Sequence, residues 1–227
     1  MAEKVQPGDF VELDYTGSLL DGTIFDTTLS SVAKEQKIFS DKTVFEPAII
    51  CIGEKQILPG VDQHLADKEV GKSFSIKLPP EEAFGKRDVK KIKMVPASTF
   101  KEHQVQPYPG LQIDVDGELG TIMRVAGGRI MVNFNHPLAG KDVQYQVTIN
   151  RKVTDYGEQI KAFLHSTLRL PQDKMSVSMK ENIAEVTIPF TLPPQFTEAL
   201  AKKLKEITKV KEVHIFSEKA APGSENI

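Results

Sequence analysis

The segment FVELDYTGSLLDGTIFD, residues 10–26, decides how the N-terminal part of the chain folds. Apolar and polar residues alternate from Phe10 to Tyr15, which is the pattern of a β-strand with one face in a core. Gly17 and the pair Asp21-Gly22 then interrupt the alternation, as turn residues do. We therefore expect a strand and a turn at the start of an antiparallel sheet.

Three later segments continue this sheet around one short helix. An apolar run at 48–52 and alternating stretches at 73–78 and 144–153 each predict a strand. Pro59-Gly60 opens a helical pattern between the first two of these strands, and Gly71 ends it. The pattern is that of an α+β fold.

Turn-forming residues recur at short intervals between Gly85 and Asn133. Proline and glycine pairs there leave room for three or four short strands, which predicts a small β-rich module. Because the strand at 144–153 returns to the first sheet, we expect this module to be an insertion in the main domain rather than a domain that follows it.

The pattern becomes helical after Thr154. Asp155 and Glu158 resemble a capping box, and apolar residues then recur at helical spacing as far as Pro171. Two alternating stretches, an amphipathic helix and a last strand follow, which predicts an α-β-β-α-β unit. The expected division is a main domain at 1–86 and 133–154, an inserted module at 87–132, a C-terminal α/β domain at 155–219 and a disordered tail at 220–227.

Composition and charge exclude several classes of protein. The formal net charge of -2 gives no reason to expect a nucleic acid or an anionic membrane as partner. No apolar stretch is long enough to span a membrane, and the N-terminus lacks the apolar segment of a signal peptide. Cys51 is the only cysteine, so no internal disulfide can form. The five histidines lack metal-ligand spacing, and we expect a cytoplasmic protein without a metal or cofactor.

Several segments recur together in one known family. They are Tyr15 to Asp26, Gly53-Glu-Lys-Gln-Ile-Leu-Pro-Gly, Leu78-Pro-Pro-Glu-Glu-Ala-Phe-Gly, and Asn133-Phe-Asn-His-Pro-Leu-Ala-Gly followed by Tyr145. In order, spacing and residue type they resemble the FKBP-type peptidyl-prolyl cis/trans isomerases over residues 8–153. The resemblance implies an antiparallel half-barrel of five or six strands around one helix. The insertion resembles the chaperone module in the flap of SlyD-like and archaeal long-type members.

An enzyme of this family needs an apolar, nearly dry pocket and no nucleophile. The prolyl C–N bond has partial double-bond character and a rotation barrier of roughly 18–20 kcal/mol, and taking the imide out of water favours the twisted, less charge-separated state. The resemblance implies that seven residues line this pocket: Tyr15, Phe25, Asp26, Ile57, Leu58, Phe84 and Tyr145. Aromatic residues at strand spacing are also typical of a core, and Val61 stands where many members carry a tryptophan.

The inserted module contains more apolar residues than a unit of its size can bury. Three of the six methionines lie in it, and flexible thioethers suit a surface that adapts to varied partners. We expect a client-binding surface that includes Ile92, Met94, Phe100, Tyr108, Ile122, Met123 and Met131. The alternative is that these residues form the module's own core.

These features predict an enzyme that isomerises X-Pro bonds in folding polypeptides and holds unfolded or proline-containing clients through the inserted module. The alternative is a non-catalytic holdase, or an adaptor for the ribosome or RNA, with a vestigial prolyl pocket. The amphipathic helix and edge strand of the C-terminal domain could pair two chains. Five lysines cluster between 202 and 211, and the interspersed acidic residues, such as Glu206, favour a solvated helix face over an RNA site.

Overall fold

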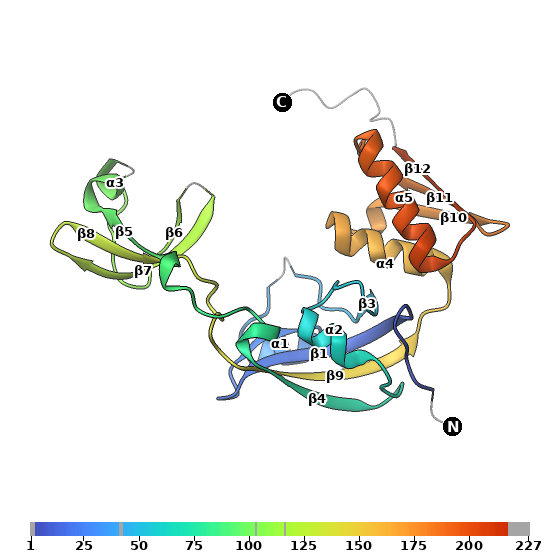
Figure 1. Ribbon diagram of the computed structural model, residues 1–227, viewed down its shortest axis with the longest axis horizontal. Coiled ribbons are helices and arrows are strands. Elements are labelled where there is room, and N and C mark those ends of the chain that lie inside the picture. Colours follow the sequence, from blue (N-terminus) through green and yellow to red (C-terminus); the bar gives the residue numbers. More distant parts are fainter. Residues whose placement is uncertain (1–2, 41–42, 103, 116, 218–227) are drawn as a thin grey trace. The chain divides into compact units, whose positions relative to one another are not determined.

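The computed structural model describes residues 3–40, 43–102, 104–115 and 117–217 (Figure 1). The tail expected at 220–227 lies outside these residues. The chain forms two compact units, one made of Met1–Lys77 with Gln144–Ile227 and the other of Leu78–Val143. Both belong to the α+β class that the sequence predicted, with mostly antiparallel sheets and few helices. Among the described residues, no helix is both long and apolar enough to cross a membrane.

A five-stranded sheet forms the base of the first unit. Its strands are β1 (Phe10–Leu19), β2 (Ile24–Thr27), β3 (Ala48–Cys51), β4 (Ser73–Leu78) and β9 (Val143–Lys152). Their order is β2-β1-β9-β4, and β3 pairs with β1. The long strand β1 serves two antiparallel partners, because its first half pairs with β3 and its second half with β2. The predicted strand from Phe10 and the turn at Asp21-Gly22 are confirmed, whereas the predicted interruption at Gly17 is wrong, because β1 continues through it to Leu19.

Two short helices accompany this sheet, α1 (Ser30–Glu35) and α2 (Pro59–Leu65). The sequence predicted that α2 would continue to Gly71, which is wrong, because the helix ends at Leu65. The backbone of the following residues bonds elsewhere: Asp67 donates its N–H to the Val5 carbonyl at 2.8 Å, and Val5 donates to the Lys68 carbonyl at 3.0 Å. Pairing with the N-terminal segment therefore replaces the last turns of the predicted helix.

The C-terminal part of the first unit contains α4 (Tyr156–Leu168), the 3-10 helix η3 (Gln172–Lys174), β10 (Ser176–Lys180), β11 (Ile183–Ile188), α5 (Pro194–Thr208) and β12 (Glu212–Ser217). In its sheet, β11 is antiparallel to β10 and parallel to β12. Asp155 caps α4 as predicted, because its carboxylate accepts the Glu158 N–H at 2.7 Å. Residues of α4 and α5 share one hydrophobic core with Phe10, Cys51 and Val153, so this part packs directly against the five-stranded sheet.

The second unit holds a four-stranded antiparallel sheet in the order β5 (Ile92–Pro96), β8 (Arg129–Asn133), β7 (Glu118–Ala126) and β6 (Gln112–Val115). The 3-10 helices η1 (Pro80–Glu82) and η2 (Val89–Lys91) precede it, and α3 (Ala97–Glu102) follows β5. Phe100 of α3 is buried with Ile122, Ile130, Val132 and Phe134. The sequence predicted only strands here, since a six-residue helix is too short to show a helical period.

Candidate functional site

Three aromatic rings meet on the five-stranded sheet, one each from β1, β2 and β9. The ring centroids of Tyr15 and Tyr145 are 5.8 Å apart, with the planes at 52°, and those of Phe25 and Tyr145 are 5.9 Å apart, edge to face at 77°. Tilted and edge-to-face contacts of this kind are favourable. Tyr145 is buried, whereas Tyr15 and Phe25 are half-buried. Two of the three rings therefore keep surface with which they can contact a ligand.

Gly17 allows these rings to approach β1 closely. A Cβ atom at this position would lie 2.8 Å from the Phe25 ring and 2.9 Å from the Tyr145 ring, far inside ordinary contact. The sequence prediction treated Gly17 only as a break in the strand pattern. A glycine inside a strand often marks a close approach of other groups, and that signal could have identified it as a residue that shapes the site.

Asp26 places a carboxylate beside the ring cluster. It accepts hydrogen bonds from the Tyr15 hydroxyl and the Thr27 N–H. Burial and the negative charge of Asp26 raise the pKa of both the Tyr15 and the Tyr145 hydroxyl well above the usual range. Asp26 as a whole residue is exposed. Desolvation of its carboxyl nevertheless raises the pKa of Asp26, and the two hydrogen bonds offset part of this rise. Both phenols therefore stay protonated at neutral pH and can donate hydrogen bonds.

Two buried threonines fix the end of β2 against β1. The hydroxyl of Thr28 donates to Asp14 Oδ1 at 2.7 Å and accepts the Tyr15 N–H at 3.0 Å. The hydroxyl of Thr27 donates to the Tyr15 carbonyl at 3.1 Å. Buried polar groups with satisfied partners hold a single arrangement. These bonds therefore position Tyr15 relative to Asp26, and the sequence prediction did not include the threonines.

Ile57 and Leu58 lie half-buried in the loop before α2. Asp62, which is itself buried, shapes this loop, because its carboxylate accepts the N–H of Gly53 at 2.9 Å and of Lys55 at 3.1 Å. Charged acceptors of backbone N–H groups make strong hydrogen bonds. The sequence prediction missed Asp62, because its position in a helical pattern gives no sign of bonds to the preceding loop.

Phe84 belongs to the second compact unit, whereas the other six predicted pocket residues belong to the first. Its ring stacks on the ring of His136, with centroids 4.6 Å apart and planes at 1°. His136 Nδ1 accepts the Leu138 N–H at 3.1 Å, and the Gly85 carbonyl accepts the Gly140 N–H at 2.8 Å. The loop before β9 thus holds Phe84 in place. The contribution of Phe84 to the pocket stays a prediction.

The seven residues expected to bind clients differ in burial. Met94, Tyr108 and Met123 are 62%, 57% and 41% exposed, Ile92 and Met131 are half-buried, and Phe100 and Ile122 are buried. Phe100 and Ile122 are core residues of the second unit, as the alternative supposed, and they cannot contact a client while this unit is folded. Met94 on β5 lies opposite Met131 on β8, so these two share a face of the sheet.

Two family models and one solved structure match parts of the chain. The family model of FKBP-type peptidyl-prolyl cis-trans isomerases matches residues 1–101, and that of the FKBP26 IF domain matches residues 93–138. Among solved structures, the three FKBP domains of wheat FKBP73 match with 18% identity and a TM-score of 0.36, over 67% of this chain and 42% of that one.

Two relatives extend this comparison. The short-type peptidyl-prolyl cis-trans isomerase of Methanocaldococcus jannaschii is 30% identical over 149 residues, which are 66% of this chain and 94% of the relative. The FKBP-type peptidyl-prolyl cis-trans isomerase SlyD of Aeromonas hydrophila is 28% identical over 148 residues, 64% of this chain and 63% of the relative. The chain belongs to the family of FKBP-type peptidyl-prolyl cis-trans isomerases.

Proposed function

We propose that the enzyme isomerises X-Pro bonds in the pocket that Tyr15, Phe25, Asp26 and Tyr145 line. The observation that supports this proposal is the cluster of three rings around one carboxylate that is hydrogen-bonded to Tyr15. Such a group of side chains offers apolar surface, two protonated phenols and no reactive nucleophile. Rotation about a prolyl bond needs apolar surroundings and no nucleophile.

The chemistry follows from how the imide bond responds to its surroundings. In water, resonance makes the planar bond charge-separated and stiff, with a barrier of roughly 18–20 kcal/mol. The rings of Tyr15 and Phe25, which keep exposed surface, exclude water from the bound imide, which disfavours the charge-separated form and so favours the twisted geometry. The carboxylate of Asp26 accepts hydrogen bonds from the Tyr15 hydroxyl and the Thr27 N–H, which hold it beside the rings. Ile57 and Leu58 are the residues of the same unit that we expect to complete the walls.

Exchange NMR on a short Ala-Pro peptide tests this location without a coupling protease. Phe25→Ala is expected to lower kcat/KM by about tenfold or more, which corresponds to ~1.4 kcal/mol of lost transition-state stabilisation. Phe216→Ala is a matched control, because Phe216 is an exposed phenylalanine on β12 of the same unit. A Phe25→Ala variant that is folded and as fast as the wild type would refute the proposed location. A folded wild type that gives no acceleration would favour the non-catalytic holdase.

We propose further that the second unit binds unfolded client segments through its exposed apolar residues. Met94 and Met123 are exposed, and Met131 lies beside Met94 on the same face. A bulge in β7 between Ile122 and Arg124 displaces Met123 from the regular pairing with β8. Methionine side chains adapt to different partners at little cost, so a surface of this kind suits varied unfolded segments.

Refolding of a protein whose slow step is prolyl isomerisation tests this role of the second unit. The double change Met94→Ser and Met123→Ser should slow catalysed refolding several-fold while leaving the rate on a short peptide as it was, because only the long chain needs a second contact. Phe196→Ser on α5 is the matched control, with similar exposure in the other unit. Equal refolding rates for the double variant and the wild type would contradict the proposal.

The C-terminal part carries a proposal of its own, the pairing of two chains. Within the described residues β12 ends the sheet order β10-β11-β12, and Phe216 on it is 52% exposed. An edge strand with an exposed aromatic residue is a template for a second strand. Light scattering on the wild type and on Phe216→Asp tests it, since a monomer mass for the wild type would rule the pairing out.

A further inference from the structure

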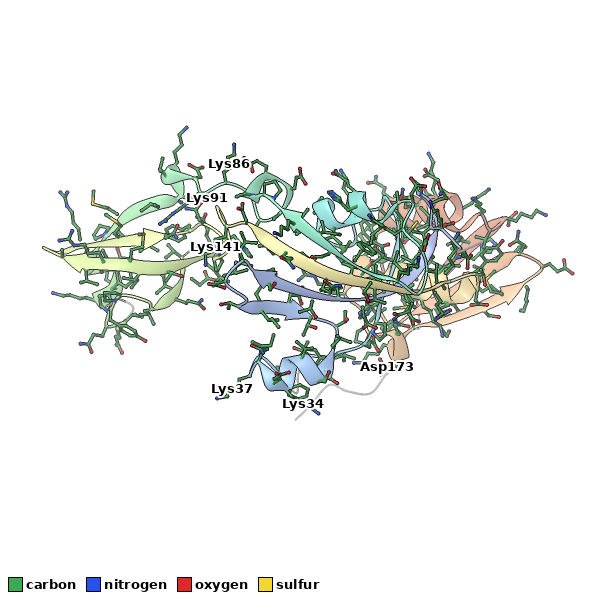
Figure 2. The ribbon with its side chains drawn as sticks, turned by 90° about the horizontal axis from the view of Figure 1, so that it is seen from below. Lys34, Lys37, Lys86, Lys91, Lys141 and Asp173 are labelled. Atoms are coloured by element: carbon green, nitrogen blue, oxygen red, sulfur yellow. The ribbon has the colours of Figure 1, made fainter. Side chains whose placement is uncertain are left out.

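A cleft of about 270 Å³ opens between the five-stranded sheet and α4, inside the first unit. One wall includes Tyr15 and Asp26 of the candidate pocket together with residues 46–50, which lead into and form β3. The opposite wall comes from the C-terminal part, where His165 and Ser166 lie on α4 and Gln172 lies in η3 next to Asp173, labelled in Figure 2. Cleft and candidate pocket thus share two side chains.

The C-terminal wall of this cleft is fixed in place by polar contacts. The Gln56 side chain accepts the Cys51 N–H at 2.7 Å and donates to Ser166 Oγ at 2.5 Å, which ties the end of β3 to α4. Glu54, in the loop that carries Gln56, forms an ion pair with Lys203 on α5 at 2.8 Å. The shared hydrophobic core lies beneath these contacts. The two walls therefore keep a defined separation, as a binding site requires.

The lining combines apolar side chains, such as Val44 and Ile49, with acidic and polar ones. Asp26 and Glu46 contribute two carboxylates, and no lysine or arginine occurs among the lining residues that the structure describes. His165 donates its Nδ1–H to the Leu170 carbonyl at 2.8 Å, which leaves Nε2 as its second hydrogen-bonding atom. Ser166 adds a hydroxyl. A cationic side chain with N–H donors is the group that such a lining complements.

We propose that this cleft binds the part of the substrate chain next to the isomerised X-Pro bond and favours a lysine or arginine there. The inference rests on the proposed location of the prolyl pocket. Because Tyr15 and Asp26 belong to both sites, a chain seated in the pocket passes directly into the cleft, and an extended residue spans about 3.3–3.6 Å. A lysine within a few residues of the proline therefore reaches Glu46. The C-terminal part of the chain would thus select substrates for the isomerase domain.

Five Ala-Pro peptides test the selection by exchange NMR: one neutral, two with a lysine two residues before or after the X-Pro pair, and two with glutamate in these places. We expect one lysine peptide to exceed the neutral peptide in kcat/KM by about two- to fivefold, the range that partly exposed ion pairs give. Glu46→Gln should remove most of this preference. Gln172→Lys, which adds a cation on the C-terminal wall, should remove it and favour a glutamate peptide.

Controls separate this inference from the proposed function. Glu181→Gln changes an exposed carboxylate outside the cleft and should keep the lysine preference. Two results would overturn the inference while the isomerase function stands. One is an active wild type with equal kcat/KM for all peptides, and the other is a lysine preference that Gln172→Lys does not change. If no peptide is accelerated, the proposed function fails, and the inference is then tested by peptide binding in NMR titrations. A lysine peptide should still shift the Ser166 amide signal more than the neutral peptide does. Equal shifts would refute the inference.

Discussion

Replacing Gly17 with alanine should disturb the candidate pocket directly. The new Cβ would lie 2.8 Å from the Phe25 ring and 2.9 Å from the Tyr145 ring, so both rings must retreat by about half an ångström to reach ordinary contact. Overpacking of this kind costs roughly 1–3 kcal/mol, and the stiffer unfolded chain returns about 0.4–1 kcal/mol. We expect a net loss of stability on the order of 1–2 kcal/mol.

The loss of activity should be larger than the loss of stability suggests, because the displaced rings are walls of the pocket. Misplacement by about 1 Å can cost as much as ~100-fold in rate, and we expect a fall in kcat/KM of about tenfold in peptide exchange NMR. Gly120→Ala is the matched control, since its Cβ would lie 2.6 Å from Val132 in the second unit. It should cost similar stability in urea and leave peptide turnover intact. A Gly17→Ala variant with wild-type turnover would show that these rings do not form the pocket.

Three further predictions concern titratable side chains. The pKa of Asp26 is higher in the folded than in the unfolded protein, so stability falls as pH rises through the window between the two values. Asp26→Asn should flatten this fall in urea unfolding from pH 3 to 7. An unchanged dependence of stability on pH would refute the prediction. Asp62→Asn should cost about 1–3 kcal/mol in the same assay, because the buried acceptor of the Gly53 and Lys55 N–H groups is weakened. Burial raises the pKa of the Cys51 thiol to about 12. Alkylation of this thiol at pH 8, followed by mass spectrometry, should therefore occur only at the rate of unfolding. Fast labelling without urea would contradict this prediction.

The sequence predicted those elements whose pattern is local. Residues 10–26 alternate and then turn, and Asp155 caps a helix through a bond to a residue three positions on, so both could be recognised without knowledge of the fold. The end of α2 depends on pairing with Val5, more than sixty residues away in the chain, and α3 is too short to carry a period. Contacts distant in sequence leave no trace in a local pattern.

The same distinction applies to the candidate site. Tyr15, Phe25, Asp26 and Tyr145 were named from a family resemblance, and the structure brings these four together. The residues that support them were missed, because the role of Gly17 exists only once β1, β2 and β9 are assembled.

Burial in the second unit was no easier to predict. Apolar residues of the second unit are buried at some positions, such as Ile130, and exposed at others, such as Leu119. The bulge in β7 also shifts the alternation on which a prediction of faces depends. Ile122 is buried and its neighbour Met123 is 41% exposed, at the point where the bulge interrupts the pairing with β8.

The most direct test of the central claim is two-dimensional exchange NMR on an Ala-Pro peptide with a substoichiometric amount of the wild-type protein. Uncatalysed exchange takes tens to hundreds of seconds, so the peptide alone gives no exchange cross-peaks within a mixing time of about one second. We predict cross-peaks between the cis and trans signals in the presence of the wild type, and their loss with Phe25→Ala. Their absence with a folded wild type would contradict the conclusion that this chain catalyses prolyl isomerisation.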